Sequence, residues 1–252
     1  MKGLKGLILP VGLLVIAEQC ARIFGISSDT LAAPSQILVA AWTLLTDGSL
    51  LAMTRQTMTA VLGGLLLGGS LGLALAILLG LSPVLTRLLR YPIEAFRPIP
   101  SIAVLPIALM IFGFGYKLEI SIIAFAAFWP NLIIGQAAIS GIEPRLLEVS
   151  KVLGLGFFGR VTKIVLPAAL PRLFLAFRLA AAVSLVVAVT VEIAMNPQGL
   201  GYELMAAQNS LRPEVMFAIL LYYGLFGWSL NAFLMFAQTR LFGAAGALKL
   251  PR

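Results

Sequence analysis

The sequence contains no histidine and only one cysteine, Cys20, in 252 residues. This composition excludes an internal disulfide, a Cys/His metal site and a catalytic nucleophile activated by histidine. The sequence also lacks the G-x4-G-K-[ST] loop that holds nucleotide phosphates. We therefore expect that the chain is not an enzyme, that it binds no metal or cofactor of its own, and that it does not hydrolyse ATP.

Charge is scarce as well. Charged residues make up 11% of the chain, whereas soluble domains carry about 25%. Hydrophobic residues make up 60%, and the mean hydropathy is +1.03. The composition predicts an all-α integral membrane protein without a soluble domain, so that residues 1–252 form a single transmembrane domain. Segments long enough to cross a bilayer are predicted at about 4–24, 58–81, 99–114, 120–140, 173–194 and 215–238.

The basic residues indicate how these six spans are oriented. If the N-terminus is cytoplasmic, the outer side carries only Arg22, Arg55, Lys117 and Arg212 of the 18 basic residues. Cytoplasmic loops of membrane proteins are enriched in Lys and Arg, so both termini are predicted to be cytoplasmic. The net charge of +8 is explained by this topology, and no nucleic-acid partner is expected. Membrane lipid surrounds the spans.

A polar, basic stretch at about 141–171 separates the fourth and fifth predicted spans. Pro144 suits the first position of a helix, and Gly154 suits its C-terminal cap. The amphipathic segment between them is too short to cross a bilayer and marginal as an isolated helix. We expect it to rest on the membrane domain with one face and on a partner with the other. The alternative is a loop helix that merely caps the bundle.

The same stretch carries a spaced motif, E-x5-G-x9-I-x-L-P, formed by Glu148, Gly154, Ile164, Leu166 and Pro167. It resembles the cytoplasmic coupling loop of bacterial ABC-importer permeases, which docks on a separate ATPase. That family usually has Ala-Ala after the glutamate, where this chain has Val149 and Ser150.

Further strings resemble the nitrate/sulfonate/taurine branch of these permeases, in order along nearly the whole chain. They begin at Ala33 (APS), Gly80 (GLSP), Arg97 (RPIP), Glu143 (EPRLLE), Leu166 (LPAALP) and Gly199 (GLGY). The resemblance implies the type I ABC-importer permease fold with six transmembrane helices, in the bacterial inner membrane. It also implies two cytoplasmic ATP-binding subunits that hold ATP and Mg, an extracytoplasmic solute-binding protein, and a second permease copy in a dimer of usually identical subunits.

Polar residues and prolines inside the spans are candidates for the translocation path or its gate. Glu192 is predicted at the outer end of the fifth span, where ionisable groups face protein or water rather than lipid. The alternative is a carboxylate at the interface, satisfied by water or by a neighbouring helix end. Pro98, Pro100 and Pro106 predict a kink near the third span, beside the path or simply in the bundle.

Two further polar residues have milder interpretations. Asn131 is a weaker candidate for the path, because such residues more often bond a helix backbone. Arg178 is expected to extend toward the cytoplasmic interface.

The function indicated is that of a permease subunit that couples solute import to a separate ATPase. The resemblance favours a nitrate-, sulfonate- or taurine-like anion. Relatives of that branch also carry cyanate, bicarbonate or vitamin precursors, so these substrates stay open. An ATP-independent carrier or channel and a membrane scaffold are the alternatives from other classes, and neither requires the spaced loop motif.

Overall fold

The computed structural model describes residues 2–23 and 30–246, which contain helices and connecting turns but no strand. The longest helices are α1 (Lys2–Ile23), α3 (Ser49–Leu81), α6 (Tyr116–Ser140), α9 (Leu166–Ala194) and α11 (Pro213–Gly246). Shorter ones are α2 (Pro34–Thr46), α4 (Pro83–Phe96), α5 (Leu105–Phe112), α7 (Pro144–Val152), α8 (Phe157–Arg160) and α10 (Gly199–Asn209). The all-α prediction is confirmed.

The centre of the bundle is the contact between α3 and α6, and α9 packs against both of them. Small residues on α3 permit this approach. A side chain at Gly68 would collide with the carbonyl of Ala124, and one at Gly72 with the carbonyl of Phe128. Close backbone approach through glycine is how helices associate in lipid, where apolar side chains gain nothing by leaving the solvent.

Four helical segments are long and apolar enough to cross a membrane: Ser49–Leu81, Tyr116–Ser140, Phe157–Ala194 and Pro213–Gly243. A fifth crossing is formed if α4 and the segment Ser101–Phe112, which meet at an angle of 82°, count as one broken span. The predicted span 4–24 corresponds to α1, but residue 24 and half of the side chains of α1 lie outside the described part of the chain. Six spans therefore stay a prediction.

The predicted third span, 99–114, is wrong as a single straight helix. Pro98 and Pro100 lie in the break after α4, a short 3-10 turn (Ser101–Val104) follows, and Pro106 is the second residue of α5. Proline lacks the N–H that would continue a helix, so the chain turns here. With eight residues, α5 extends only about 12 Å and cannot cross a bilayer alone.

The starts of two other helices differ most from the prediction. Helix α3 begins at Ser49 rather than at residue 58, because α2 turns directly into it at Gly48, whose φ is +79°. Helical structure leading into α9 begins at Phe157 rather than at residue 173. A π-helical turn, Val161–Val165, precedes Pro167, so the missing proline donor falls where α9 starts.

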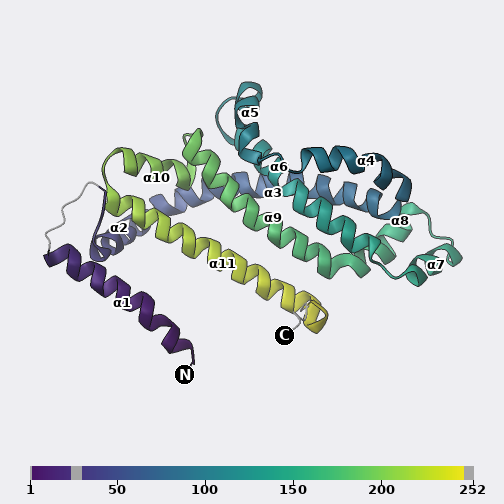
Figure 1. The fold of residues 1–252 in the computed structure, drawn as a ribbon, viewed down its shortest axis with the longest axis horizontal. Helices are drawn as coiled ribbons and strands as arrows, with labels where there is room; N and C mark the ends of the chain where they lie inside the picture. The colour runs from purple at the N-terminus through teal and green to yellow at the C-terminus, as the bar shows by residue number, and fades with distance from the viewer. Residues whose placement is uncertain (1, 24–29, 247–252) are drawn as a thin grey trace.

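The two polar ends of the bundle lie far apart. In Figure 1, α7 lies at one end of the long axis, and α2 and α10 lie at the other. Helices α3, α6, α9 and α11 run along the axis between them. We refer to these as the α7 end and the α10 end.

Candidate functional site

The first turn of α10 is anchored to the bundle by side chains from two other helices. Helices leave their first N–H groups without partners inside the helix, and here three of them are satisfied from outside. The bonds run from Gly199 N to Gln56 Oε1 (3.0 Å), from Leu200 N to Thr57 Oγ1 (3.0 Å) and from Gly201 N to Glu192 Oε2 (2.7 Å). Helices α3 and α9 therefore hold α10 by its amino terminus.

Glu192 is the centre of this anchor. Its side chain is 1% exposed, and its second oxygen accepts a hydrogen bond from Thr57 Oγ1 at 2.7 Å. A carboxylate is favoured at a helix N-terminus because the helix dipole is positive there. The sequence offered water or a neighbouring helix end as the partner of an interfacial carboxylate, and the structure shows the helix end, because Gly201 N of α10 donates to Glu192.

A second buried carboxyl group lies beside Glu192. Glu119, at the start of α6, is fully buried, and the two carboxyl groups are close enough to hydrogen-bond when one of them is protonated. Glu119 Oε2 accepts from Asn196 Nδ2 at 2.8 Å, and Asn196 Oδ1 accepts from Gly115 N at 2.8 Å. No described residue donates to Glu119 Oε1. We call Thr57, Glu119, Glu192, Asn196 and Gly199–Gly201 the carboxyl cluster.

The sequence analysis did not identify Glu119 as a candidate. It could have done so, because Glu119 is the only acidic residue between positions 115 and 142, and an isolated acidic residue in an apolar stretch is a candidate for a functional site. The predicted span began at residue 120, and that boundary placed this glutamate in a loop. The structure begins α6 four residues earlier, at Tyr116.

A cavity of about 360 Å³ adjoins the carboxyl cluster at the α10 end. Its wall includes Glu192, Met195, Tyr202, Asn209 and Ser210, from the end of α9 and from α10 and the turn after it. Any movement of α10 away from α9 would open this cavity and break the bonds to Glu192. Glu192 thus holds the first turn of α10 to the end of α9 at this end of the bundle.

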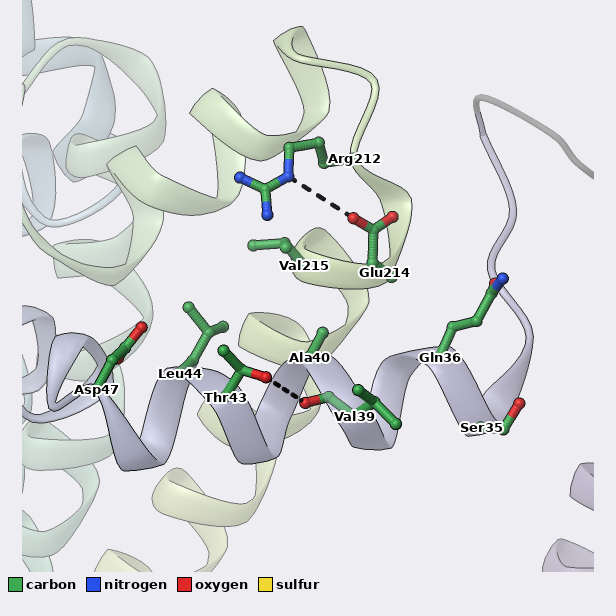
Figure 2. Close-up of a pocket in the computed structure, with 10 residues that line it drawn as sticks. All are labelled: Ser35, Gln36, Val39, Ala40, Thr43, Leu44, Asp47, Arg212, Glu214 and Val215. Carbon is green, nitrogen blue, oxygen red and sulfur yellow. Dashed lines mark hydrogen bonds and ion pairs between the residues drawn. The ribbon is translucent and has the colours of Figure 1, made fainter.

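A larger cavity, of about 600 Å³, lies at the same end between α2 and the start of α11 (Figure 2). Its polar side chains already have partners. Arg212 and Glu214 pair at 3.7 Å, and Thr43 donates to Val39 O. The Ser49 hydroxyl and backbone N–H both donate to Asp47 and hold the pKa of that carboxyl below its usual value. This cavity offers no unpaired buried group for chemistry.

At the α7 end, the helix predicted from the loop motif is present. Helix α7 begins at Pro144 and ends at Val152. Gly154 has a φ of +62°, and Leu155 N donates to Ser150 O at 3.0 Å. This is the left-handed glycine cap with its wrapped-back hydrogen bond that terminates many helices.

The residues of the motif differ in their exposure. Glu148 and Val149 are exposed, whereas Ser150 is buried and donates to Leu147 O. Ile164 and Leu166 are half-buried on either side of the fully buried Val165, and Pro167 is exposed at the start of α9. Ile164 and Leu166 thus lie in the helical segment that leads into the bundle, whereas Glu148 lies on the surface.

Large apolar side chains are exposed around α7. They are Leu146 (42%), Val149 (49%), Val152 (87%), Leu153 (64%), Phe157 (46%) and Phe158 (81%). These residues belong to a polar, basic stretch rather than to a predicted span. The first four precede the segment Phe157–Ala194, which is apolar enough to cross a membrane. Contiguous exposed apolar side chains beside such a segment indicate a surface that another protein covers.

The remaining candidates lie apart from the carboxyl cluster. Asn131 is buried against α3, where its amide donates to Ala127 O of its own helix at 2.9 Å. Pro98, Pro100 and Pro106 are exposed at and after the break that follows α4. The structure does not bring these residues together with Glu192.

Residues 64–243 match the family model described as "Binding-protein-dependent transport system inner membrane component". The match covers most of the chain, including the whole α7 loop and every residue of the carboxyl cluster except Thr57. The chain belongs to this family. It is the permease subunit of an ABC importer, and the family is one of transport proteins rather than enzymes. Members work with ATP-binding subunits and a binding protein.

Named relatives place this permease in the nitrate/sulfonate/taurine branch. It is 29% identical to the putative aliphatic sulfonates transport permease SsuC of Bacillus subtilis, over 94% of this chain and 86% of the relative. It is 30% identical to the nitrate import permease NrtB of Leptolyngbya laminosa, over 82% and 78%. It is 26% identical to the taurine transport permease TauC of Escherichia coli, over 77% and 71%.

The fold has a counterpart among solved structures. A chain of the MetNI methionine ABC transporter in an inward-facing conformation aligns with a TM-score of 0.63 and 22% sequence identity. The alignment covers 74% of the permease and 91% of that chain. The type I ABC-importer permease fold expected from the sequence is confirmed.

Proposed function

We propose that the permease imports a small oxyanion and is driven by an ATPase that docks on α7. The observation that carries the coupling part is α7 itself, a glycine-capped helix surrounded by exposed apolar side chains at one end of the bundle. In this proposal Glu148, Val149 and Gly154 face the ATPase. Ser150, Ile164, Leu166 and Pro167 hold the docking helix on α9. The coupling loop comprises about residues 141–171 of a single domain, 1–252.

The substrate part rests on the relatives named for aliphatic sulfonates, nitrate and taurine. These solutes share a planar or tetrahedral oxyanion group. Cyanate, bicarbonate and vitamin precursors are the competing solutes. The carboxyl cluster would act as the gate at the α10 end, with the break at Pro98, Pro100 and Pro106 as a flexible point and Asn131 as a packing residue between α3 and α6.

The uptake test uses liposomes that contain the whole importer. With the binding protein outside and ATP inside, uptake of taurine or of nitrate is expected, and it should stop when ATP is omitted. The competing solutes, added in excess, should not reduce it. Import of a vitamin precursor in place of both anions would refute the substrate part, and uptake without ATP would refute the coupling part.

Two further features belong to the proposal. The permease would work as a homodimer in the bacterial inner membrane, with both termini and α7 in the cytoplasm and α10 on the outer side. The predicted outer basic residues Arg55 and Arg212 lie toward the α10 end, whereas Arg145 and Arg160 lie toward the α7 end. This distribution supports the orientation through the enrichment of basic residues in cytoplasmic loops.

Cysteine labelling tests this orientation. In a Cys20→Ser background, Ser210→Cys and Glu143→Cys place one exposed thiol at each end of the bundle. A membrane-impermeant maleimide is expected to label Ser210→Cys in intact spheroplasts, and to label Glu143→Cys only after permeabilisation. The reverse pattern would show that the orientation is inverted.

A further inference from the structure

A crevice of about 230 Å³ lies between α9 and α11. Most of its wall is apolar, but Arg178 of α9 and Tyr223 and Asn231 of α11 also line it. The Tyr223 hydroxyl donates to Leu185 O at 2.6 Å, which ties the two helices together at one end of the crevice. Arg178 lies nearer the α7 end.

Arg178 is placed within the apolar part of α9. It precedes the end of the helix at Ala194 by sixteen residues, or about 24 Å at 1.5 Å per residue, in a hydrocarbon layer about 30 Å thick. No other charged residue occurs between positions 173 and 191. Ionisable side chains at such depth face protein or water rather than lipid. The guanidinium group therefore favours a crevice that faces protein or water over one that faces lipid.

The sequence predicted that Arg178 extends toward the cytoplasmic interface, and this stays a prediction. The guanidinium group reaches α11, where Nη1 donates to Gln238 Oε1 at 3.2 Å. This is the one hydrogen bond that Arg178 makes within the described residues, and a guanidinium group has five N–H donors. Arg178 is half-buried and lines the crevice.

Asn231 supplies a second polar group to the same crevice. Its side chain is exposed in the single chain, and it interrupts an apolar run of α11 that contains Trp228, Phe233 and Leu234. An exposed amide is as unsuited to lipid as an exposed guanidinium group, since neither finds a hydrogen-bond partner there. Two helices thus each direct one polar side chain into one small apolar crevice.

We propose that Arg178 and Asn231 form an oxyanion-binding site in the translocation path, which the transported anion occupies on its way to the α7 end. This proposal rests on the proposed substrate class. The planar fork of a guanidinium group matches the oxygens of a nitrate or sulfonate group, and the amide N–H adds a neutral donor. One cation with one amide suits a path, because a transported ion must bind well enough to enter and weakly enough to leave.

The test separates this role from a structural one with three variants of the reconstituted importer. Arg178→Gln removes the charge, Arg178→Lys keeps it, and Gln238→Leu removes the hydrogen bond between α9 and α11 but leaves the charge. The probes are taurine and nitrate, and the readout is anion imported per ATP hydrolysed. Loss of a charge-assisted contact should lower this ratio about tenfold in Arg178→Gln, less in Arg178→Lys, and little in Gln238→Leu.

Other outcomes overturn the inference. Equal losses in Arg178→Gln and Gln238→Leu would show that the pair only pins the two helices. Loss of the permease dimer in Arg178→Gln would make Arg178 a contact between subunits. Normal import by all variants would remove Arg178 from the path while leaving the proposed function intact. If wild-type importer carries neither anion, the substrate proposal fails first, and the oxyanion site fails with it.

Discussion

Glu192→Gln is expected to reduce ATP-driven uptake about tenfold and to weaken the attachment of α10, because a buried donor loses its acceptor. Both oxygens of Glu192 accept hydrogen bonds, one from Thr57 Oγ1 and the other from Gly201 N. Glutamine has the same shape but only one acceptor, so its NH2 group must face one of these donors. The measurement is uptake in liposomes together with ATPase stimulation by the loaded binding protein.

Glu119→Gln is the matched control, and the structure predicts a different result for it. Glu119 accepts one hydrogen bond, from Asn196, through Oε2, while Oε1 has no donor among the described residues. A glutamine can keep the bond to Asn196 and direct its NH2 group to the adjacent Glu192 carboxyl, as a protonated Glu119 would. Uptake close to that of wild type is therefore expected.

Two results would contradict the proposed role of the contact between Glu192 and α10. If Glu192→Gln leaves both uptake and ATPase stimulation unchanged, the carboxyl cluster is packing and not part of a gate. If Glu119→Gln fails as severely as Glu192→Gln, the loss comes from disturbing the buried carboxyl pair rather than from a missing acceptor at α10. The difference between two chemically identical substitutions is what identifies the bond to α10.

The contrast between Glu192 and Glu119 also shows what the sequence was able to predict. A glutamate in an apolar helix is conspicuous, so Glu192 was found. Its partners were not, because Thr57, Asn196 and Gly201 are separated from it in sequence or are ordinary residues of a turn. Their roles depend on how α3, α6, α9 and α10 meet in space, which no local pattern determines. Glu119 was missed because the predicted span began at residue 120, four residues after the start of α6 at Tyr116.

Sequence patterns predicted correctly those features that depend only on neighbouring residues in the chain. Pro144 and Gly154 correctly bounded α7, since a helix start and a left-handed cap depend on the residues at those positions. Hydropathy was wrong at 99–114, because it measures how apolar a segment is and not whether the chain is straight, and the prolines there divide the segment.

Gly154→Val is expected to lower the yield of ATPase that co-purifies with the permease by about tenfold, and uptake should fall with it. Gly154 has a φ of +62°, and no neighbouring atom lies within 4 Å of the point that a Cβ would occupy. The substitution therefore meets no steric obstacle inside the permease. Its cost of about 1–2 kcal/mol comes from the left-handed backbone, which L-residues avoid, and β-branched ones most of all. The cap would open and turn the exposed apolar residues of α7 away from the ATPase.

Gly156→Val is the control two residues away. Gly156 also has open space around it, but its φ is −64° and its backbone is extended, so valine fits there without strain. Gly154→Asn is a graded variant, because asparagine is the residue that most often replaces glycine in a left-handed cap. Assembly should therefore be near normal in Gly156→Val, reduced slightly in Gly154→Asn and reduced most in Gly154→Val, while the membrane bundle still folds and inserts in all three. Normal assembly and uptake in Gly154→Val would remove α7 as the coupling element. Equal losses at Gly154 and Gly156 would mean that added bulk, and not the cap geometry, disturbs the contact with the ATPase.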